Sequence, residues 1–123
     1  MNSEKTMAIE RYTWDEMEKE VMSDQLSRRY VTGEKAMLAQ IYLKKGALVP
    51  THQHESEQIT YILEGALLFR LEGKEITVRK GQVLLIPSNV PHSAEALEDT
   101  VDLDVFSPIR QDWINKEDAY LRR

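Results

Sequence analysis

The sequence contains no cysteine, which excludes disulfide bonds, thiolate metal ligands and cysteine nucleophiles. It also lacks any uninterrupted apolar run that approaches the length needed to cross a bilayer. Residues 1–7 are polar and do not form the apolar core of a secretion signal. We therefore expect a cytoplasmic protein without a membrane partner.

Basic residues are fewer than acidic residues. Sixteen Lys and Arg residues stand against twenty-one Asp and Glu residues, which gives a net charge of −5. This balance disfavours nucleic acid and anionic membrane surfaces as partners, although one arginine could still bind a small anion. A chain of 123 residues is long enough for one domain with a hydrophobic core and too short for two of ordinary size, so we expect a single domain over residues 1–123.

Histidine is also scarce, and its placement is informative. The chain has three histidines, and two of them, His52 and His54, lie one residue apart in the segment Gly46–Gly65. On a strand, side chains two residues apart share a face, so these two imidazoles can converge, and Gln58 has the same parity if the strand is regular. His92 would have to come from a neighbouring strand.

This set favours one divalent transition metal ion, with Zn, Ni, Fe and Mn all open. Neutral imidazoles are common ligands of such metals, and an amide oxygen can supply a fourth donor. Glutamine is a weak donor beside a carboxylate, so Glu55 or Glu57 could replace Gln58 if the backbone bulges. The competing interpretation is that the histidines lie near one another by chance and bind nothing.

The chain after about residue 25 has the texture of an all-β protein. Short apolar runs alternate with glycine-containing turns, and the four prolines fall at strand ends or in connections. The expected strands are Leu26–Val31, Ala36–Leu43, Gln58–Leu63, Ala66–Leu71, Glu75–Val78, Val83–Ile86, His92–Ala96 and Val101–Phe106.

A short helix is expected at each end of the chain. Thr13 and Glu16 match a capping box, which predicts a helix through about Val21. A second short helix is expected from Gln111 onward.

The last expected strand carries acidic residues on one face. Val101, Leu103 and Val105 alternate with Asp102, Asp104 and Phe106. In an arbitrary β domain, this polar face would be solvated. In a barrel with a metal ion inside, the same face would lie across the cavity from the ligands. Arg110 follows closely, where its guanidinium could bind a substrate carboxylate, or could be a solvated partner of Asp112.

These residues resemble the motifs of the cupin superfamily. The motif GX5HXHX3EX6G matches from Gly46 to Gly65, with Gln58 in place of the usual glutamate. The motif GX5PXGX2HX3N matches at Gly81, Pro87 and His92, with Asn89 in place of glycine and Ala96 in place of asparagine. The resemblance covers about residues 36–106 and implies a small antiparallel jelly-roll barrel with a metal ion inside, often dimeric.

The segments 87–92, 94–99 and 104–113 resemble one subfamily, the KdgF-type pectin-degradation proteins. These proteins linearise 4,5-unsaturated monouronates from pectin or alginate breakdown to 4-deoxy-5-keto uronates. The resemblance implies the following roles: metal ligands His52, His54, Gln58 and His92, catalytic residues Asp104 and Arg110, and substrate-binding residues Phe106 and Arg110.

Two other functions remain open, because cupins carry many activities. One is a non-catalytic module that binds a sugar acid or effector, and the other is an iron-dependent dioxygenase. We expect a small anionic sugar as the substrate. We also expect a homodimer, with Leu26–Val31 as the candidate edge strand for pairing between subunits.

Overall fold

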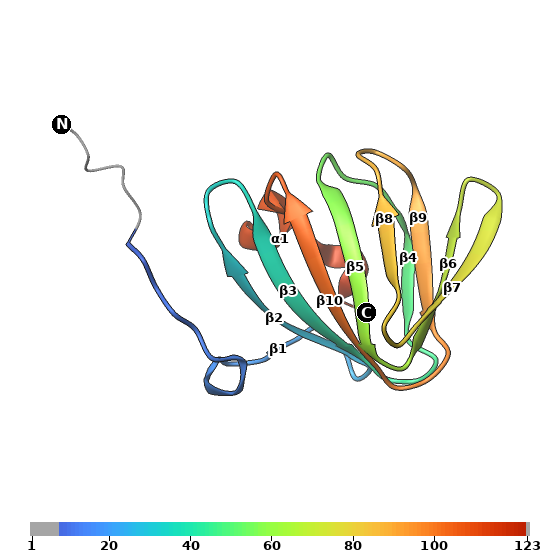
Figure 1. The fold of residues 1–123 in the computed structure, drawn as a ribbon, viewed down its shortest axis with the longest axis horizontal. Coiled ribbons are helices and arrows are strands. Elements are labelled where there is room, and N and C mark those ends of the chain that lie inside the picture. The colour runs from blue at the N-terminus through green and yellow to red at the C-terminus, as the bar shows by residue number, and fades with distance from the viewer. Residues whose placement is uncertain (1–7, 123) are drawn as a thin grey trace.

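Ten strands form two antiparallel sheets in the computed structural model, which describes residues 8–122. The six-stranded sheet has the order β1-β2-β3-β10-β5-β8, and the four-stranded sheet has the order β4-β9-β6-β7. The two sheets face each other and enclose a flattened barrel, with the described N-terminal residues leading away from it (Figure 1). The strands are β1 Glu20–Val21, β2 Leu26–Thr32, β3 Met37–Leu43, β4 Leu48–His52, β5 Glu57–Glu64, β6 Ala66–Leu71, β7 Lys74–Arg79, β8 Val83–Ile86, β9 His92–Ala96 and β10 Thr100–Ser107.

This arrangement confirms the expected antiparallel jelly-roll. All eight expected strands are present, with ends that shift by at most one residue. The sequence missed β1 and β4, because β1 has two residues and the inward and outward positions of β4 do not alternate cleanly in polarity.

Two backbone positions show why the connections have these residues. Gly65 has a φ of 88°, and a Cβ placed there would lie 2.4 Å from the Asp99 carbonyl oxygen. Asn89, which stands where the cupin motif has glycine, takes a φ of 62°. Asparagine tolerates this left-handed conformation better than most residues, so the loop before His92 keeps its shape.

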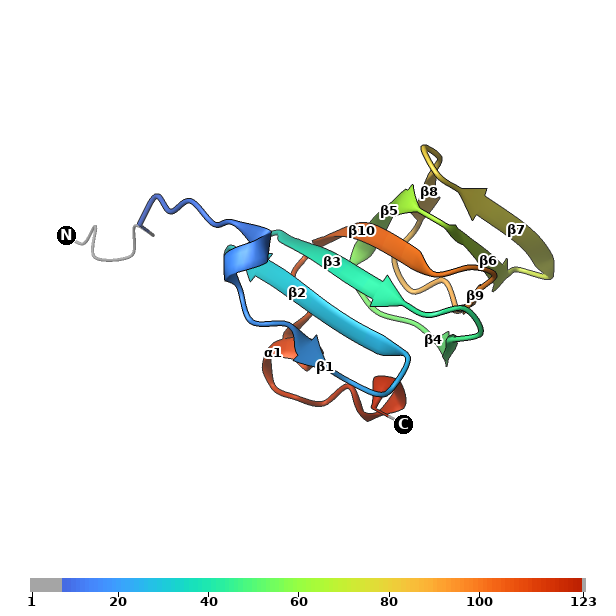
Figure 2. The ribbon, with the colours of Figure 1, turned by 90° about the horizontal axis from the view of Figure 1, so that it is seen from below.

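The apolar core lies between the sheets. Its main cluster joins residues of both sheets, and a smaller cluster of Met37, Ala39, Phe106 and Trp113 lies beneath the C-terminal residues. Figure 2 shows the C-terminal segment running along the six-stranded sheet below β1 and β2.

The expected N-terminal helix is wrong in extent. Only one 3-10 turn forms, η2 Trp14–Glu16, and the Thr13 side chain makes no capping hydrogen bond. Met17 is already extended, and Glu20–Val21 pairs with β2, so sheet pairing overrides the local helical signal. The C-terminal expectation is confirmed by α1 Gln111–Ile114, which a 3-10 turn, η3 Ala119–Leu121, follows.

Helices in this structure are all short. Within residues 8–122, none has the length and apolar character that crossing a membrane requires. The signal-sequence argument made for residues 1–7 lies outside the described residues.

Candidate metal centre

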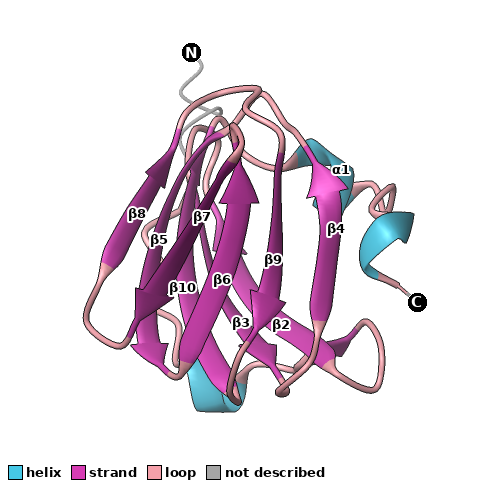
Figure 3. Cartoon of the chain, turned by 90° about the vertical axis from the view of Figure 1, so that its right-hand side faces the viewer, coloured by secondary structure: helices cyan, strands magenta, loops and turns pink. Residues whose placement is uncertain are grey.

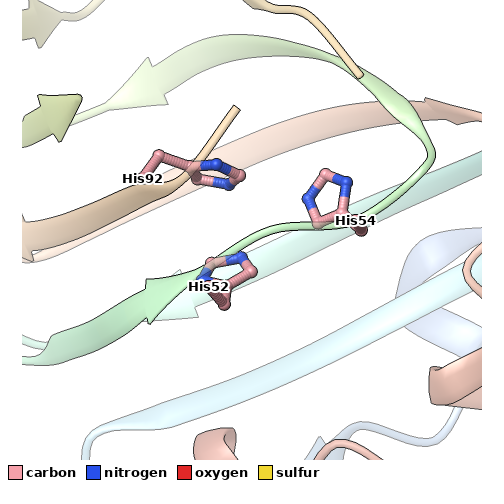
Figure 4. A group of neighbouring side chains, drawn as sticks. All are labelled: His52, His54 and His92. Atoms are coloured by element: carbon pink, nitrogen blue, oxygen red, sulfur yellow. The ribbon is translucent and has the colours of Figure 1, made fainter. Parts of the chain in front are cut away.

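The three histidines meet inside one end of the barrel (Figure 4). His52 ends β4 and lies directly opposite His92, which begins β9, while His54 lies in the loop between β4 and β5. Their ring centroids are 4.3 Å apart for His52 and His92, 5.5 Å for His52 and His54, and 5.1 Å for His54 and His92. The imidazoles therefore converge, but a cross-strand pair and a loop achieve it, not one regular strand as the sequence argument assumed.

Each imidazole is oriented by the backbone. The Nδ1 atoms of His52, His54 and His92 lie 2.8, 2.9 and 2.8 Å from the carbonyl oxygens of Pro50, Ser56 and Val90. A carbonyl only accepts hydrogen bonds, so Nδ1 is the donor in all three rings. The Nε2 lone pairs are left for a metal ion, which is how backbone contacts commonly fix a histidine ligand.

Burial keeps these rings neutral. It lowers the pKa of His52 to about 3 and that of His54 to about 4, and it also lowers the pKa of His92. A neutral imidazole has the lone pair that a metal ion needs, so no proton has to be displaced at neutral pH.

Gln58 faces the histidines, whereas Glu55 and Glu57 are exposed. The Gln58 Oε1 atom lies 3.2 Å from His54 Nε2, and Gln58 Nε2 donates to Thr60 Oγ1 at 2.8 Å. With the His54 proton on Nδ1, two acceptors face each other across this gap. A cation between them would satisfy both.

The donor set therefore fits a metal ion. The ligand atoms of His52, His54 and His92 lie within 4.8 Å of one another. His92 Nε2 is buried and has no hydrogen-bond partner within residues 8–122. A buried acceptor without a partner is costly, and a metal ion is the ligand that three neutral imidazoles and an amide oxygen suit.

The acidic face of β10 lies inside the barrel. Asp102, Asp104 and Phe106 are 4%, 2% and 1% exposed, while Val105 points outward and is 38% exposed. Thr60 Oγ1 donates to Asp104 Oδ1 at 2.7 Å, so a chain of hydrogen bonds joins Gln58 to Asp104. The solvated interpretation of these carboxyl groups is wrong.

Arg110 is buried next to the same residues. It is 3% exposed, its guanidinium lies 5.1 Å from the Phe106 ring centre, and it forms a two-bond ion pair with Asp112 (Nε to Oδ1 3.0 Å, Nη2 to Oδ2 2.8 Å). The pairing with Asp112 was one expected alternative, but the arginine is not solvated. Its Nη2 also donates to the Tyr120 hydroxyl at 2.5 Å.

A cavity of about 60 Å³ connects these groups. Its lining includes His52, His92, Asp104, Phe106 and Arg110. The C-terminal residues close one side of it. Figure 3 shows the last helical turn beside β4, and the Tyr120 ring stacks on His52 with centroids 4.8 Å apart.

The sequence argument missed three residues of the site: one connects Gln58 to Asp104, and two line the cavity. Thr60 could have been found, because it shares the parity of Gln58 on β5. Arg28 is 1% exposed and lines the cavity, but an arginine in a strand gives no sign of burial. Tyr120 reaches the site from beyond the barrel strands, so no local pattern could place it.

Comparisons with known proteins agree with this architecture. The profile of the family described as "Cupin domain" matches residues 39–107. The structure of KdgF from Halomonas sp. superposes with a TM-score of 0.75 at 32% sequence identity, covering 80% of this chain and 94% of that one. An oxalate-binding protein from Thermotoga maritima is 33% identical over 89 residues, which are 72% of this chain and 73% of that protein.

Other matches are partial. Human 3-hydroxyanthranilate 3,4-dioxygenase is 38% identical over 58 residues, which are 44% of this chain and 20% of the enzyme. The match to the first of the curated relatives covers 51% of that relative's length. The dioxygenase match covers one fifth of that enzyme.

Proposed function

The chain belongs to the family of cupin domain proteins, and from the residues inside its barrel we propose that it is a metal-dependent enzyme that linearises 4,5-unsaturated monouronates. The resemblance to KdgF-type proteins implies this reaction. One observation carries the proposal: Asp104, Phe106 and Arg110 line the same cavity as His52 and His92.

The reaction is an isomerisation that moves one proton. The unsaturated ring is a cyclic hemiacetal whose ring oxygen is also an enol ether oxygen. Loss of the anomeric hydroxyl proton and cleavage of the bond from carbon 1 to the ring oxygen give an aldehyde and an enolate. Protonation at carbon 4 then gives the ketone. When bound, a divalent ion with neutral ligands keeps its full charge and supplies a Lewis acid for anionic oxygens.

Asp104 is the group that moves the proton in this proposal. Burial raises the pKa of its carboxyl, which makes the ionised form a stronger base than an exposed aspartate. It takes the anomeric hydroxyl proton and returns a proton to carbon 4. Thr60 holds one carboxylate oxygen in place through the 2.7 Å hydrogen bond.

Arg110 and Phe106 bind and orient the sugar. The guanidinium binds the substrate carboxylate, and the Phe106 ring covers a sugar face. Because Nε and Nη2 of Arg110 already pair with Asp112, the carboxylate either uses the remaining edge of the guanidinium or displaces Asp112. Asp112 therefore keeps the arginine charge balanced until substrate arrives.

The size of the cavity favours a second candidate function. Pockets that hold drug-sized ligands usually exceed about 300 Å³, and this cavity measures about 60 Å³. A monouronate therefore requires lining side chains to move aside, whereas a small dicarboxylate such as oxalate needs less room. The second candidate is a protein that binds such an anion without converting it, in line with the Thermotoga maritima relative.

The absorbance of the 4,5-unsaturated chromophore separates the two. We expect purified, metal-loaded protein to remove this absorbance and Asp104→Asn to slow the decay by about a hundredfold or more, since general acid–base groups contribute that much. Calorimetry on the same variant should show that it still binds a uronate. Decay by the variant at the parent rate would refute the proton-transfer role, and oxalate binding without any decay would favour the second candidate.

A further inference from the structure

A second carboxyl group lies beside Asp104 and has no role in the mechanism above. We propose that Asp102 is a positioning residue: it stays protonated and donates a hydrogen bond to Asp104, which keeps the Asp104 carboxylate ionised and correctly oriented. The link to catalysis rests on the proposed function of Asp104, whereas the proton on Asp102 does not.

The geometry of β10 brings the two carboxyl groups together. They are two residues apart on one strand, and both point into the barrel. Asp102 is 4% exposed and Asp104 is 2% exposed. The six-stranded sheet places Asp102 between Ile41 and Ile62, and Asp104 between Ala39 and Thr60. Asp102 therefore has an aliphatic side chain on either side, whereas one neighbour of Asp104 is the hydroxyl-bearing Thr60.

Two ionised carboxylates this close in a medium of low polarity would repel each other, so one holds a proton. Burial raises the pKa of both groups, and that of Asp102 is raised well above its usual value. The neighbouring Asp104 carboxyl adds to the rise at Asp102, because two negative charges side by side are unfavourable.

Hydrogen-bond partners give the same assignment without reference to titration. Asp104 Oδ1 accepts from Thr60, as an ionised carboxylate should. Asp102 Oδ1 is buried and finds no partner anywhere in residues 8–122. An unsolvated oxygen costs less on a neutral acid than on a carboxylate, so the proton belongs to Asp102.

The other charged or titratable groups that line the cavity do not change the assignment of the proton to Asp102. Arg28 on β2 pairs with Glu20 and Asp118, and Arg110 pairs with Asp112. The remaining groups are His52 on β4, His92 on β9 and Tyr120 in the C-terminal segment. Arg110 favours the ionised form of Asp104.

Two substitutions distinguish hydrogen-bond donation by Asp102 from a role in packing alone. Asp102→Leu is neutral and of similar size but cannot donate, so the pKa of Asp104 should rise. We expect kcat to fall about tenfold and the acid limb of the pH–rate profile to move to higher pH. Asp102→Asn can still donate through its amide, so it should recover most of the rate and return the limb to its original position.

The infrared spectrum tests the proton without any assay of activity. At neutral pH, the difference between the parent protein and Asp102→Asn should contain the C=O band of a protonated carboxylic acid. Absence of that band would overturn the proposal, even if Asp102→Leu fails to fold. A shift of the acid limb to lower pH in both variants would also overturn it, because it would mean that a negative charge had been removed. If the band is present but the parent does not convert uronate, only the proposed function fails.

Discussion

Gln58 links the candidate metal ligands to Asp104, the proposed proton-transfer group. Its Oε1 atom faces His54, and its Nε2 atom donates through Thr60 toward Asp104. A glutamate could replace only the first of these interactions, because an ionised carboxylate has no donor for Thr60. In the proposed site, the glutamine would leave the metal charge intact, and its hydrogen bond to Thr60 supports the position of Asp104.

Gln58→Glu should retain metal and lose activity. A carboxylate binds a divalent ion at least as well as an amide, so the metal content should not fall, while kcat should fall about tenfold as the ligand set gains a negative charge. Elemental analysis and the chromophore assay on one preparation measure both. Glu57→Gln changes the adjacent, outward-facing side chain and is the matched control. Loss of metal from Gln58→Glu would contradict this account.

At the scale of single residues, the sequence identified which side chains come together better than it predicted the backbone that carries them. Residue type and spacing selected His52, His54 and Gln58, but the regular strand assumed for them ends at His52. Parity did place Asp102 and Asp104 on one face, because β10 is regular. The ligand and catalytic roles of all these residues stay predictions.

Among the elements, the C-terminal segment is the one that closes the cavity. An ion cluster holds it to the sheet: Glu20 on β1 accepts from Arg28, Lys116 and Arg122, and Asp118 pairs with Arg28 and Arg122. Trp113 packs against Arg28, with the guanidinium carbon 4.0 Å from the ring centre. Through this cluster, Glu20 of β1 helps to position Tyr120 beside His52.

Glu20→Gln should weaken this attachment in a pH-dependent way. Burial alone would raise the pKa of Glu20, but hydrogen bonds from Arg122, Lys116 and Arg28 outweigh it and lower the pKa from 4.5 to about 2. The stabilisation is therefore complete above pH 4.5 and disappears as pH falls toward 2. Because Glu20 is partly exposed, we expect a loss of about 1 kcal/mol in unfolding free energy at pH 7.

Denaturant unfolding at several pH values measures this difference. The gap between Glu20→Gln and the parent should close as the solution is acidified. Glu64→Gln, which breaks an exposed pair with Lys80, is the control and should change little at any pH. A gap that stays constant down to pH 2 would show that the charge of Glu20 is not responsible.

The predicted N-terminal helix was too long for a physical reason. The Thr13 capping signal is local, whereas the chain after it is held by pairing with β2 and by ions from residues near the C-terminus. Contacts between residues about 100 positions apart leave no periodic trace in a sequence. In β5 and β10, buried and more exposed residues alternate regularly. This local pattern is visible in the sequence, so these strands were predicted well.

Across the whole molecule, the outer face of the six-stranded sheet is unusually apolar. Two cross-strand rows of side chains run over β3, β10, β5 and β8. Their exposed members are Leu38, Ile59, Tyr61, Val83, Leu85 and Val105, with exposed fractions from 36% to 61%. The patch is on the order of 500 Å², which is comparable to the largest apolar patch of a typical monomer, and such patches are often binding surfaces.

We propose that the expected homodimer forms through this face. Strand β2 is not the edge of its sheet, because β1 pairs with it at Ser27 and Arg28. An apolar sheet face packs well on a second copy of itself, and the patch with a polar rim approaches the ~800 Å² per partner of a stable interface. Light scattering after gel filtration should give a dimer for the parent and a monomer for Leu85→Lys. Leu48→Lys, on the other sheet, should remain dimeric, and a parent monomer would refute the proposal.

The central claim is a metal-dependent uronate linearisation, and a metal titration of the chelator-treated protein tests it most directly. The measured quantity is the initial rate of chromophore loss as a divalent ion is restored. The account predicts no rate above background without metal and a linear rise that stops at one ion per chain, because His52, His54 and His92 form the one such cluster within residues 8–122. Full activity without metal, or none with the site filled, would contradict it.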